Sequence, residues 1–125
     1  GHGVKSAYDE RTMGLLRERG ITLELCPTSN LNSRVVSGWD EFVWIFDRFH
    51  QHGVRYTINT DGPEMLKTYI RDEMASLARH GILSVEQQEQ AAAWARESSF
   101  VDGADVVPLP KRTPASRRLR VREEA

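Results

Sequence analysis

Residues 54–63 read VRYTINTDGP and predict a β-strand that ends on an acid. From Val54 to Asn59 apolar and polar residues alternate, which is the period-two pattern of a half-buried strand. The strand delivers Asp61 to its carboxyl end, and Gly62 and Pro63, which break regular structure, follow at once. A carboxylate at the tip of a strand is the first indication of a site.

The segments before this strand predict a helix, a second strand and another helix. Apolar residues recur at helical spacing over Asp40–His52, with Asp40 as the expected N-cap and Gly53 as the stop. Residues 21–25, ITLEL, alternate and are closed by a proline, so they predict a strand. A short helix is expected over Asp9–Arg19, which carries acids early and basic residues late.

The remaining segments predict a loop and two further helices. Residues 28–38 are rich in Ser and Asn, show no period and are expected to form a loop. Helical spacing continues over residues 64–80, which predicts a single helix there. Ser84 and Gln87 fit an S-x-x-Q capping box, which predicts a helix through about Ser99.

The order of elements predicts an α/β fold with a parallel sheet. Helical spacers of a dozen or more residues separate the strands, as in right-handed β-α-β units. Two strands do not make a stable parallel sheet, so we expect residues 1–102 to be the closing part of a larger α/β domain. The Pro- and Arg-rich residues 103–125 predict a flexible C-terminal tail. Because the chain opens without Met, we expect an N-terminal portion outside this sequence.

The balance of charged residues indicates which classes of partner to expect. The 125 residues hold 17 basic and 18 acidic side chains, for a formal net charge of −1. We therefore expect neither nucleic acid nor a membrane as a partner. Apolar runs such as Phe42–Phe46 are far shorter than the roughly 20 residues that span a bilayer. The single cysteine, Cys26, is compatible with a reducing compartment, and we expect a cytoplasmic protein.

Three polar segments are expected at the carboxyl ends of strands, where parallel α/β folds place their active sites. They are residues 1–3, 26–30 and 59–63. A histidine, His2, and a carboxylate, Asp61, at one edge are what metal-assisted hydrolysis needs. Two plainer interpretations stay open: Asp61 as a turn residue bonded to its own backbone, and His2 as an incidental terminal residue.

The other residues of metal-binding or nucleophilic type are not expected to do chemistry. Cys26 has no basic neighbour to lower its pKa, so we expect it to act as a small buried hydrophobe. His50, His52 and His80 lie near expected helix C-termini, which suits a cation or a solvated ring. His50 and His52 form an H-x-H pair, but residues two apart on a helix do not face each other.

The sequence resembles the C-terminal third of the adenosine deaminase family. GHGV, LELCPTSN and NTDGP occur here in the order and spacing in which that family has GHG, LE-CPxSN and NTDDP. The resemblance covers roughly residues 1–100. It implies the C-terminal portion of a (β/α)8 TIM-type barrel that deaminates a purine by zinc-dependent hydrolysis, with an aminopurine or nucleoside as the small-molecule substrate.

The resemblance also implies roles for individual residues. His2 matches the histidine that assists the zinc-bound water, and Asp61 matches an aspartate that is a zinc ligand. The implied reaction is attack of zinc hydroxide on the amino-bearing ring carbon, followed by loss of ammonia. The family's other zinc ligands and its proton-shuttling glutamate have no match in these 125 residues. We therefore expect the chain to be inactive alone and to need the upstream remainder of the barrel.

One departure from the family pattern bears on the substrate. Gly62 stands where the family has a second aspartate that hydrogen-bonds the purine ring, so the substrate-binding position lacks a carboxylate. Either another group supplies the contact, Glu64 being the nearest acid, or the substrate is an aminopurine other than adenosine. Two alternatives stay open: a catalytically inactive barrel homologue acting as a binding protein, and a separate small α/β protein.

Overall fold

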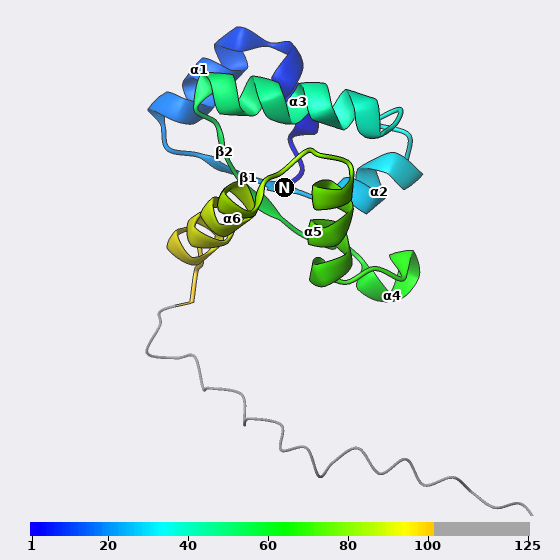
Figure 1. The fold of residues 1–125 in the computed structure, drawn as a ribbon. Coiled ribbons are helices and arrows are strands. Elements are labelled where there is room, and N and C mark those ends of the chain that lie inside the picture. Colours follow the sequence, from blue (N-terminus) through cyan, green and yellow to red (C-terminus); the bar gives the residue numbers. More distant parts are fainter. Residues whose placement is uncertain (102–125) are drawn as a thin grey trace, which may run out of the picture.

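The fold is taken from a computed structural model that describes residues 1–101 (Figure 1). The tail expected over residues 103–125 lies outside the described residues. The elements, in chain order, are η1 (Val4–Tyr8), α1 (Glu10–Glu18), β1 (Thr22–Leu25), α2 (Pro27–Asn32), α3 (Trp39–His52), β2 (Arg55–Ile58), α4 (Pro63–Leu66), α5 (Ile70–Arg79) and α6 (Val85–Glu97). The described part of the chain is thus a helix-rich α/β structure.

The two predicted strands form a parallel pair, as expected. β1 pairs with β2 in a register that sets Leu23 opposite Tyr56 and Leu25 opposite Ile58. These four side chains are buried, whereas Glu24, between the two leucines, is exposed. The alternation read from the sequence therefore separates an apolar face of the sheet from a polar one.

The core gathers on the apolar face, around the ring of Tyr56. Phe46 of α3 meets that ring edge-on at 5.0 Å between centroids, and Trp94 of α6 meets it at 5.4 Å. Helix α1 packs beside α3, as Figure 1 shows. No helix within residues 1–101 is long and apolar enough to cross a membrane.

The expected helix boundaries are confirmed where a local signal sets them. Ser84 and Gln87 form the predicted capping box of α6, with mutual hydrogen bonds of 2.8 and 3.2 Å. Gly53 ends α3 with φ of 65°, a left-handed conformation that glycine adopts without steric cost. The predicted N-cap of α3 is wrong: the helix begins at Trp39, after Gly38, so Asp40 lies in its first turn and faces its positive dipole end.

Two segments differ from the sequence prediction. Residues 28–38 are not all loop, because α2 begins with Pro27 at its first position, where a proline needs no backbone hydrogen bond. The single helix expected over residues 64–80 is two helices, α4 and α5. The chain leaves α4 at Lys67, whose φ is 50°, and restarts where the Tyr69 N–H donates to the Asp72 side chain at 2.9 Å.

The ring of Phe46 gives the first prediction. Phe46 is fully buried, so Phe46→Ala leaves a cavity against Tyr56 and is expected to lower the free energy of unfolding by about 3–5 kcal/mol. Asp47→Ala, at an exposed neighbour on the same helix, is expected to change it by less than about 0.5 kcal/mol. Urea denaturation followed by tryptophan fluorescence measures both. Equal effects from the two variants would contradict the assigned packing.

His50 is a half-buried base built into this core. Its Nε2 lies 2.7 Å from the Tyr56 hydroxyl, and the side-chain amide nitrogen of Gln87 lies 3.4 Å from its Nδ1. An amide nitrogen only donates, so this pairing suits the neutral ring. Burial lowers the pKa of His50, and the weaker opposing effect is the charge of Asp47.

The lowered pKa of His50 predicts how stability depends on pH. Below the ordinary histidine pKa of about 6.5, the unfolded chain binds a proton that the folded chain excludes, so the free energy of unfolding falls as pH drops. The decrease continues until pH reaches the lowered pKa of the folded state. His50→Gln is expected to show a smaller loss of stability than wild type between roughly pH 7.5 and 5. Identical pH profiles from urea titrations would show that His50 is not held neutral.

Candidate active site

Three segments distant in sequence end side by side at one edge of the sheet. The backbone N–H of His2 donates to the Glu24 carbonyl at 2.8 Å, so residues 1–3 run along the free side of β1. On the other side of β1, the N–H of Asn59 donates to the Leu25 carbonyl at 2.8 Å. The carboxyl ends of β1 and β2 and the segment holding His2 therefore share one rim, as the sequence predicts.

Asp61 occupies the rim just beyond β2. Its φ of 62° is left-handed, which turns the chain sharply before Pro63 starts α4. The hydroxyl of Ser29, on α2, donates to Asp61 Oδ2 at 2.8 Å. The Asp61 side chain is 48% exposed. The carboxylate is thus oriented by Ser29, on the helix that follows β1, while it stays accessible from solvent.

His2 faces the same carboxylate. Its Nε2 lies 3.8 Å from Asp61 Oδ2, and Asn30 Nδ2 lies 3.3 Å from its Nδ1. Because the Asn30 amide nitrogen donates to Nδ1, the neutral ring carries its hydrogen on Nε2, toward Asp61. Asn30 is itself 4% exposed, and its Oδ1 is buried without a hydrogen-bond partner among the described residues. The structure therefore brings together the two residues that the sequence singled out.

A hollow of about 650 Å³ opens in front of this pair. It is lined by Gly1, His2, Glu24, Cys26, Ile58, Asn59, Thr60, Asp61 and Ile70. The walls combine an imidazole and carboxylates, which can orient a polar ligand, with a few apolar side chains. A polar ligand seated there meets His2 and Asp61 at once.

Cys26 lines the hollow but has the properties of a structural residue. It is 6% exposed, and its thiol lies 3.8 Å from the Glu24 carbonyl oxygen. Burial, followed by the negative charges of Asp61, Glu73 and Glu24, raises the pKa of the thiol to about 11. A thiol at that pKa is not a nucleophile near neutral pH, as the sequence predicts.

Gly62 follows Asp61 at the rim and precedes the first turn of α4. Its φ of −107° is open to any residue, and a Cβ built there would meet only the Met65 Cβ, at 3.9 Å. Neither backbone geometry nor crowding requires glycine at this position. The site therefore lacks a side chain at a point where the fold has room for one.

Reasoning from sequence placed Ser29 and Asn30 at this rim, within residues 26–30, without their contacts, and it missed Glu73. The first two lie in a segment without period, where a hydroxyl or amide gives no sign of its partner. Glu73 is 1% exposed, and it accepts hydrogen bonds from the Thr28 N–H and the Thr68 hydroxyl. A signal for it existed, since an acid at an apolar position of a helical pattern, three residues after Ile70, indicates a buried carboxyl group.

The rim offers the right donor types for a divalent metal but not a complete set. Asp61 Oδ1 accepts no hydrogen bond from the described residues, and His2 Nε2 lies 3.8 Å from the other oxygen, Oδ2. Residues 1–101 contain no group of three or more His, Cys, Asp or Glu side chains placed to hold an ion. A catalytic zinc site has about three protein ligands and an open position. Asp61 fits as one ligand, and the others must come from outside the described residues.

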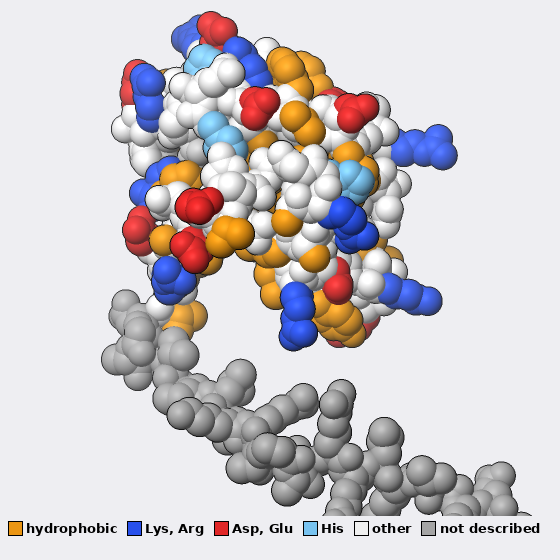
Figure 2. All heavy atoms as spheres, viewed as in Figure 1, with side chains coloured by type: hydrophobic (Ala, Val, Ile, Leu, Met, Phe, Trp, Pro, Cys, Tyr) orange, Lys and Arg blue, Asp and Glu red, His pale blue; other side chains and the backbone are white. Residues whose placement is uncertain are grey.

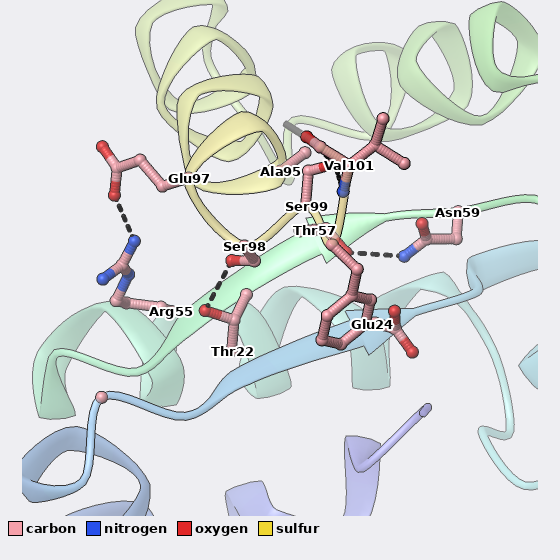
Figure 3. A pocket seen from close by; sticks show the side chains of 12 residues that line it. Thr22, Glu24, Arg55, Thr57, Asn59, Ala95, Glu97, Ser98, Ser99 and Val101 are labelled. Carbon is pink, nitrogen blue, oxygen red and sulfur yellow. Dashed lines mark hydrogen bonds and ion pairs between the residues drawn. The ribbon is translucent and has the colours of Figure 1, made fainter. Parts of the chain in front are cut away.

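A second hollow, of about 690 Å³, runs along the polar face of the sheet toward the start of the strands (Figure 3). Its polar side chains largely bind one another. Arg55 pairs with Glu97, and the Ser98 hydroxyl donates to Thr22 Oγ1 at 3.1 Å. These contacts fasten the end of α6 to the sheet. Neither His2 nor Asp61 lines this hollow.

The next feature is the distribution of charge on one face of the molecule. Acidic and basic side chains are interspersed on the face seen in Figure 2. No single-sign field is therefore evident on that face to select a strongly charged partner.

The family model described as "Adenosine deaminase" matches residues 1–109. An aminodeoxyfutalosine deaminase of Streptomyces coelicolor is 40% identical over 104 residues, which is 82% of this chain and 26% of that protein. An adenosine deaminase of Plasmodium vivax is 30% identical over 102 residues, 82% of this chain and 28% of that protein. An adenosine deaminase of Escherichia coli is 34% identical over 115 residues, 92% of this chain and 34% of that protein.

The chain thus spans about a quarter to a third of the length of the curated relatives that it matches. The matched residues include all three segments of the rim. The match over most of the chain agrees with the resemblance of the three motifs, and it establishes that the chain belongs to the adenosine deaminase family.

Proposed function

We propose that this chain, as part of a longer protein, carries out zinc-dependent hydrolytic deamination of adenosine or a related aminopurine. The observation that carries the proposal is the approach of His2 Nε2 to Asp61 Oδ2, 3.8 Å apart, where His2 belongs to residues 1–3 beside β1 and Asp61 follows β2. Membership of a deaminase family supports the reaction type. The substrate is accordingly a small nucleoside-like molecule.

The proposed fold of the whole protein is a (β/α)8 TIM-type barrel, of which this chain is the C-terminal portion. Among residues 1–101, β2 pairs only with β1, so its second edge is open to another strand. Three apolar side chains near the rim, Met65, Tyr69 and Ile70, are 89%, 69% and 47% exposed. Both features support the upstream remainder of the barrel as the partner that covers them.

In the proposed reaction water adds to the amino-bearing ring carbon and ammonia leaves. Zinc, when bound, acts as a Lewis acid that makes water more acidic. Asp61 would hold the ion, with Ser29 fixing the orientation of its carboxylate. His2, whose Nδ1 is occupied by Asn30, presents an N–H at Nε2. This group would orient the attacking oxygen and hold a proton at Nε2.

The proposal includes a cytoplasmic location, supported by the unpaired, buried Cys26.

Removing the carboxylate of Asp61 tests this proposal. In the full-length protein, Asp61→Ala is expected to lower ammonia release from aminopurine nucleosides by at least about 1,000-fold, because it removes a metal ligand and the partner of Ser29. Bound zinc, measured by elemental analysis, is expected to fall with it. Asp47→Asn, an exposed acid on α3, is the matched control and is expected to keep both.

Two results would overturn the proposal. One is a wild-type protein that binds no metal and releases no ammonia from any aminopurine, which would favour a binding protein with an inactive barrel. Gly62 is the feature that favours that alternative. The other is an Asp61→Ala variant that retains zinc and turnover.

Gly62 bears on which aminopurine is accepted. By the family resemblance, the residue after the metal-ligating aspartate hydrogen-bonds the purine ring, and here it has no side chain to do so. The space beside Gly62 is open apart from Met65, so a ligand group or water can occupy it. We propose that Gly62 widens the substrate range beyond adenosine, toward compounds such as aminodeoxyfutalosine, the substrate named for one relative.

The variant Gly62→Asp tests this role. It is expected to raise the ratio of kcat/KM for adenosine over aminodeoxyfutalosine by at least about tenfold, because it supplies a charged hydrogen-bond acceptor. Its stability is expected to change by less than about 1 kcal/mol, since the backbone and space at Gly62 admit a side chain. Gly62→Ala adds the Cβ without the carboxylate and is expected to leave the ratio unchanged. An equal change of this kcat/KM ratio in both variants would show that the size of the added side chain, and not its carboxylate, causes the effect.

A further inference from the structure

Glu73 is a buried acid with no place in the chemistry described above. It lies on α5 and is 1% exposed. Its Oε2 accepts from the backbone N–H of Thr28 at 3.2 Å, and its Oε1 accepts from the Thr68 hydroxyl at 3.0 Å. One carboxyl group therefore joins the segment after β1 to the segment after β2, across 45 residues of sequence.

The bond to Thr28 supplies a cap that α2 lacks locally. The first N–H groups of a helix have no partner inside the helix. The N-cap residue of α2 is Cys26, which makes no side-chain capping bond, and Pro27 has no N–H. Glu73 accepts from the next residue, Thr28, and so satisfies the start of α2 from outside. A buried carboxyl group also needs such donors, because an unpaired one is costly.

The residues after Thr28 are the two that orient the catalytic pair. Ser29 donates to Asp61, and Asn30 lies against His2 Nδ1. The first turn of α2 thus carries both contacts, and Glu73 holds that turn by its backbone. On its other oxygen, Glu73 holds Thr68, seven residues after Asp61.

The rim contains backbone conformations that need such support. His2, Asp61 and Lys67 have φ of 53°, 62° and 50°, all in the left-handed region that L-residues seldom occupy. Conformations of this kind persist where surrounding contacts fix them. Glu73 binds Thr28, next to the Ser29 that donates to Asp61, and Thr68, which follows α4, so it is placed to support that turn from both sides.

We propose that Glu73 is a positioning residue for the deamination site: it locks α2 to the start of α5 so that Ser29 and Asn30 hold Asp61 and His2 in register. This inference rests on the proposed function. Glu73 does not touch the reacting atoms, because its oxygens are occupied and buried behind the rim. Its effect reaches the site through the backbone of α2.

Three variants of the full-length protein test the role. Glu73→Ala is expected to lower kcat by about 10–100-fold, the loss typical of residues that orient metal ligands, with a smaller change in KM. Glu73→Gln keeps an acceptor for the Thr28 N–H and a hydrogen-bonding group for Thr68, and is expected to restore kcat to within about threefold of wild type. Thr68→Val removes one of the two donors and is expected to lower kcat by about 3–10-fold.

The matched control is Leu77→Val. Leu77 is buried on the same helix, and its apolar side chain makes no hydrogen bond to α2 or to Thr68. This variant is expected to lower stability and leave kcat unchanged at temperatures where the protein is folded. Should Glu73→Ala fail to fold, Glu73→Gln and Thr68→Val decide the question. Equal loss of kcat in Leu77→Val and Thr68→Val, or full activity in Glu73→Ala, would overturn the proposal.

A second readout does not depend on turnover. Hydrogen–deuterium exchange of the peptide covering residues 27–32 is expected to be at least about tenfold faster in Glu73→Ala, or in Thr68→Val, than in Leu77→Val. Wild-type protein that releases no ammonia would refute the proposed function. In that event the exchange rates still decide whether Glu73 holds α2, and unchanged rates would overturn the positioning role.

Discussion

The backbone hydrogen bond from the Asn59 N–H to the Leu25 carbonyl, 2.8 Å long, carries the parallel ladder one residue beyond the two strands. The bond from the His2 N–H to the Glu24 carbonyl attaches residues 1–3 to the other side of β1. Together they align three chain segments at their carboxyl ends. Because the alignment uses main-chain atoms, it does not depend on which side chains the rim carries, and the approach of His2 to Asp61 depends on it.

The two faces of the sheet have different roles: one buries the core and the other lines the hollow at the rim. Side chains on one face, centred on Tyr56, meet α3 and α6 and bury the core. The other face carries Glu24 and Asn59, which line the hollow at the rim. A shift of register by one residue would exchange the two faces and put charged groups in the core. The hydrophobic contacts of Tyr56 therefore also hold the polar face where it is.

Sequence reasoning succeeded where the deciding signal is local. The alternation around Leu23 and Tyr56 predicted both strands, and the side chains of Ser84 and Gln87 predicted the start of α6. His2 and Asp61 were expected at one edge because parallel strands end together. A few neighbouring residues are enough to predict these elements.

It failed where a partner lies far away in sequence. Pro27 suits the first position of a helix, but the group that caps α2 is Glu73 on α5, which is distant in sequence. The break after α4 falls at Lys67, with neither Gly nor Pro to mark it. The contacts of Ser29 with Asp61 are likewise visible only after the strands are paired.

These non-local contacts cluster at the rim for a physical reason. A site needs polar side chains held still, and a buried polar group stays buried only when a matched partner reaches it. Asn30 and Glu73 are both more than nine-tenths buried, and each meets a group from another segment. An apolar residue at either position would pack without a directional partner. It would therefore leave His2 or α2 without the hydrogen bond that holds it. The rim thus relies on directional hydrogen bonds between segments, whereas the core relies on contacts that tolerate exchange among hydrophobic residues. Substitutions at the rim are therefore expected to disturb its geometry as well as the stability of the fold.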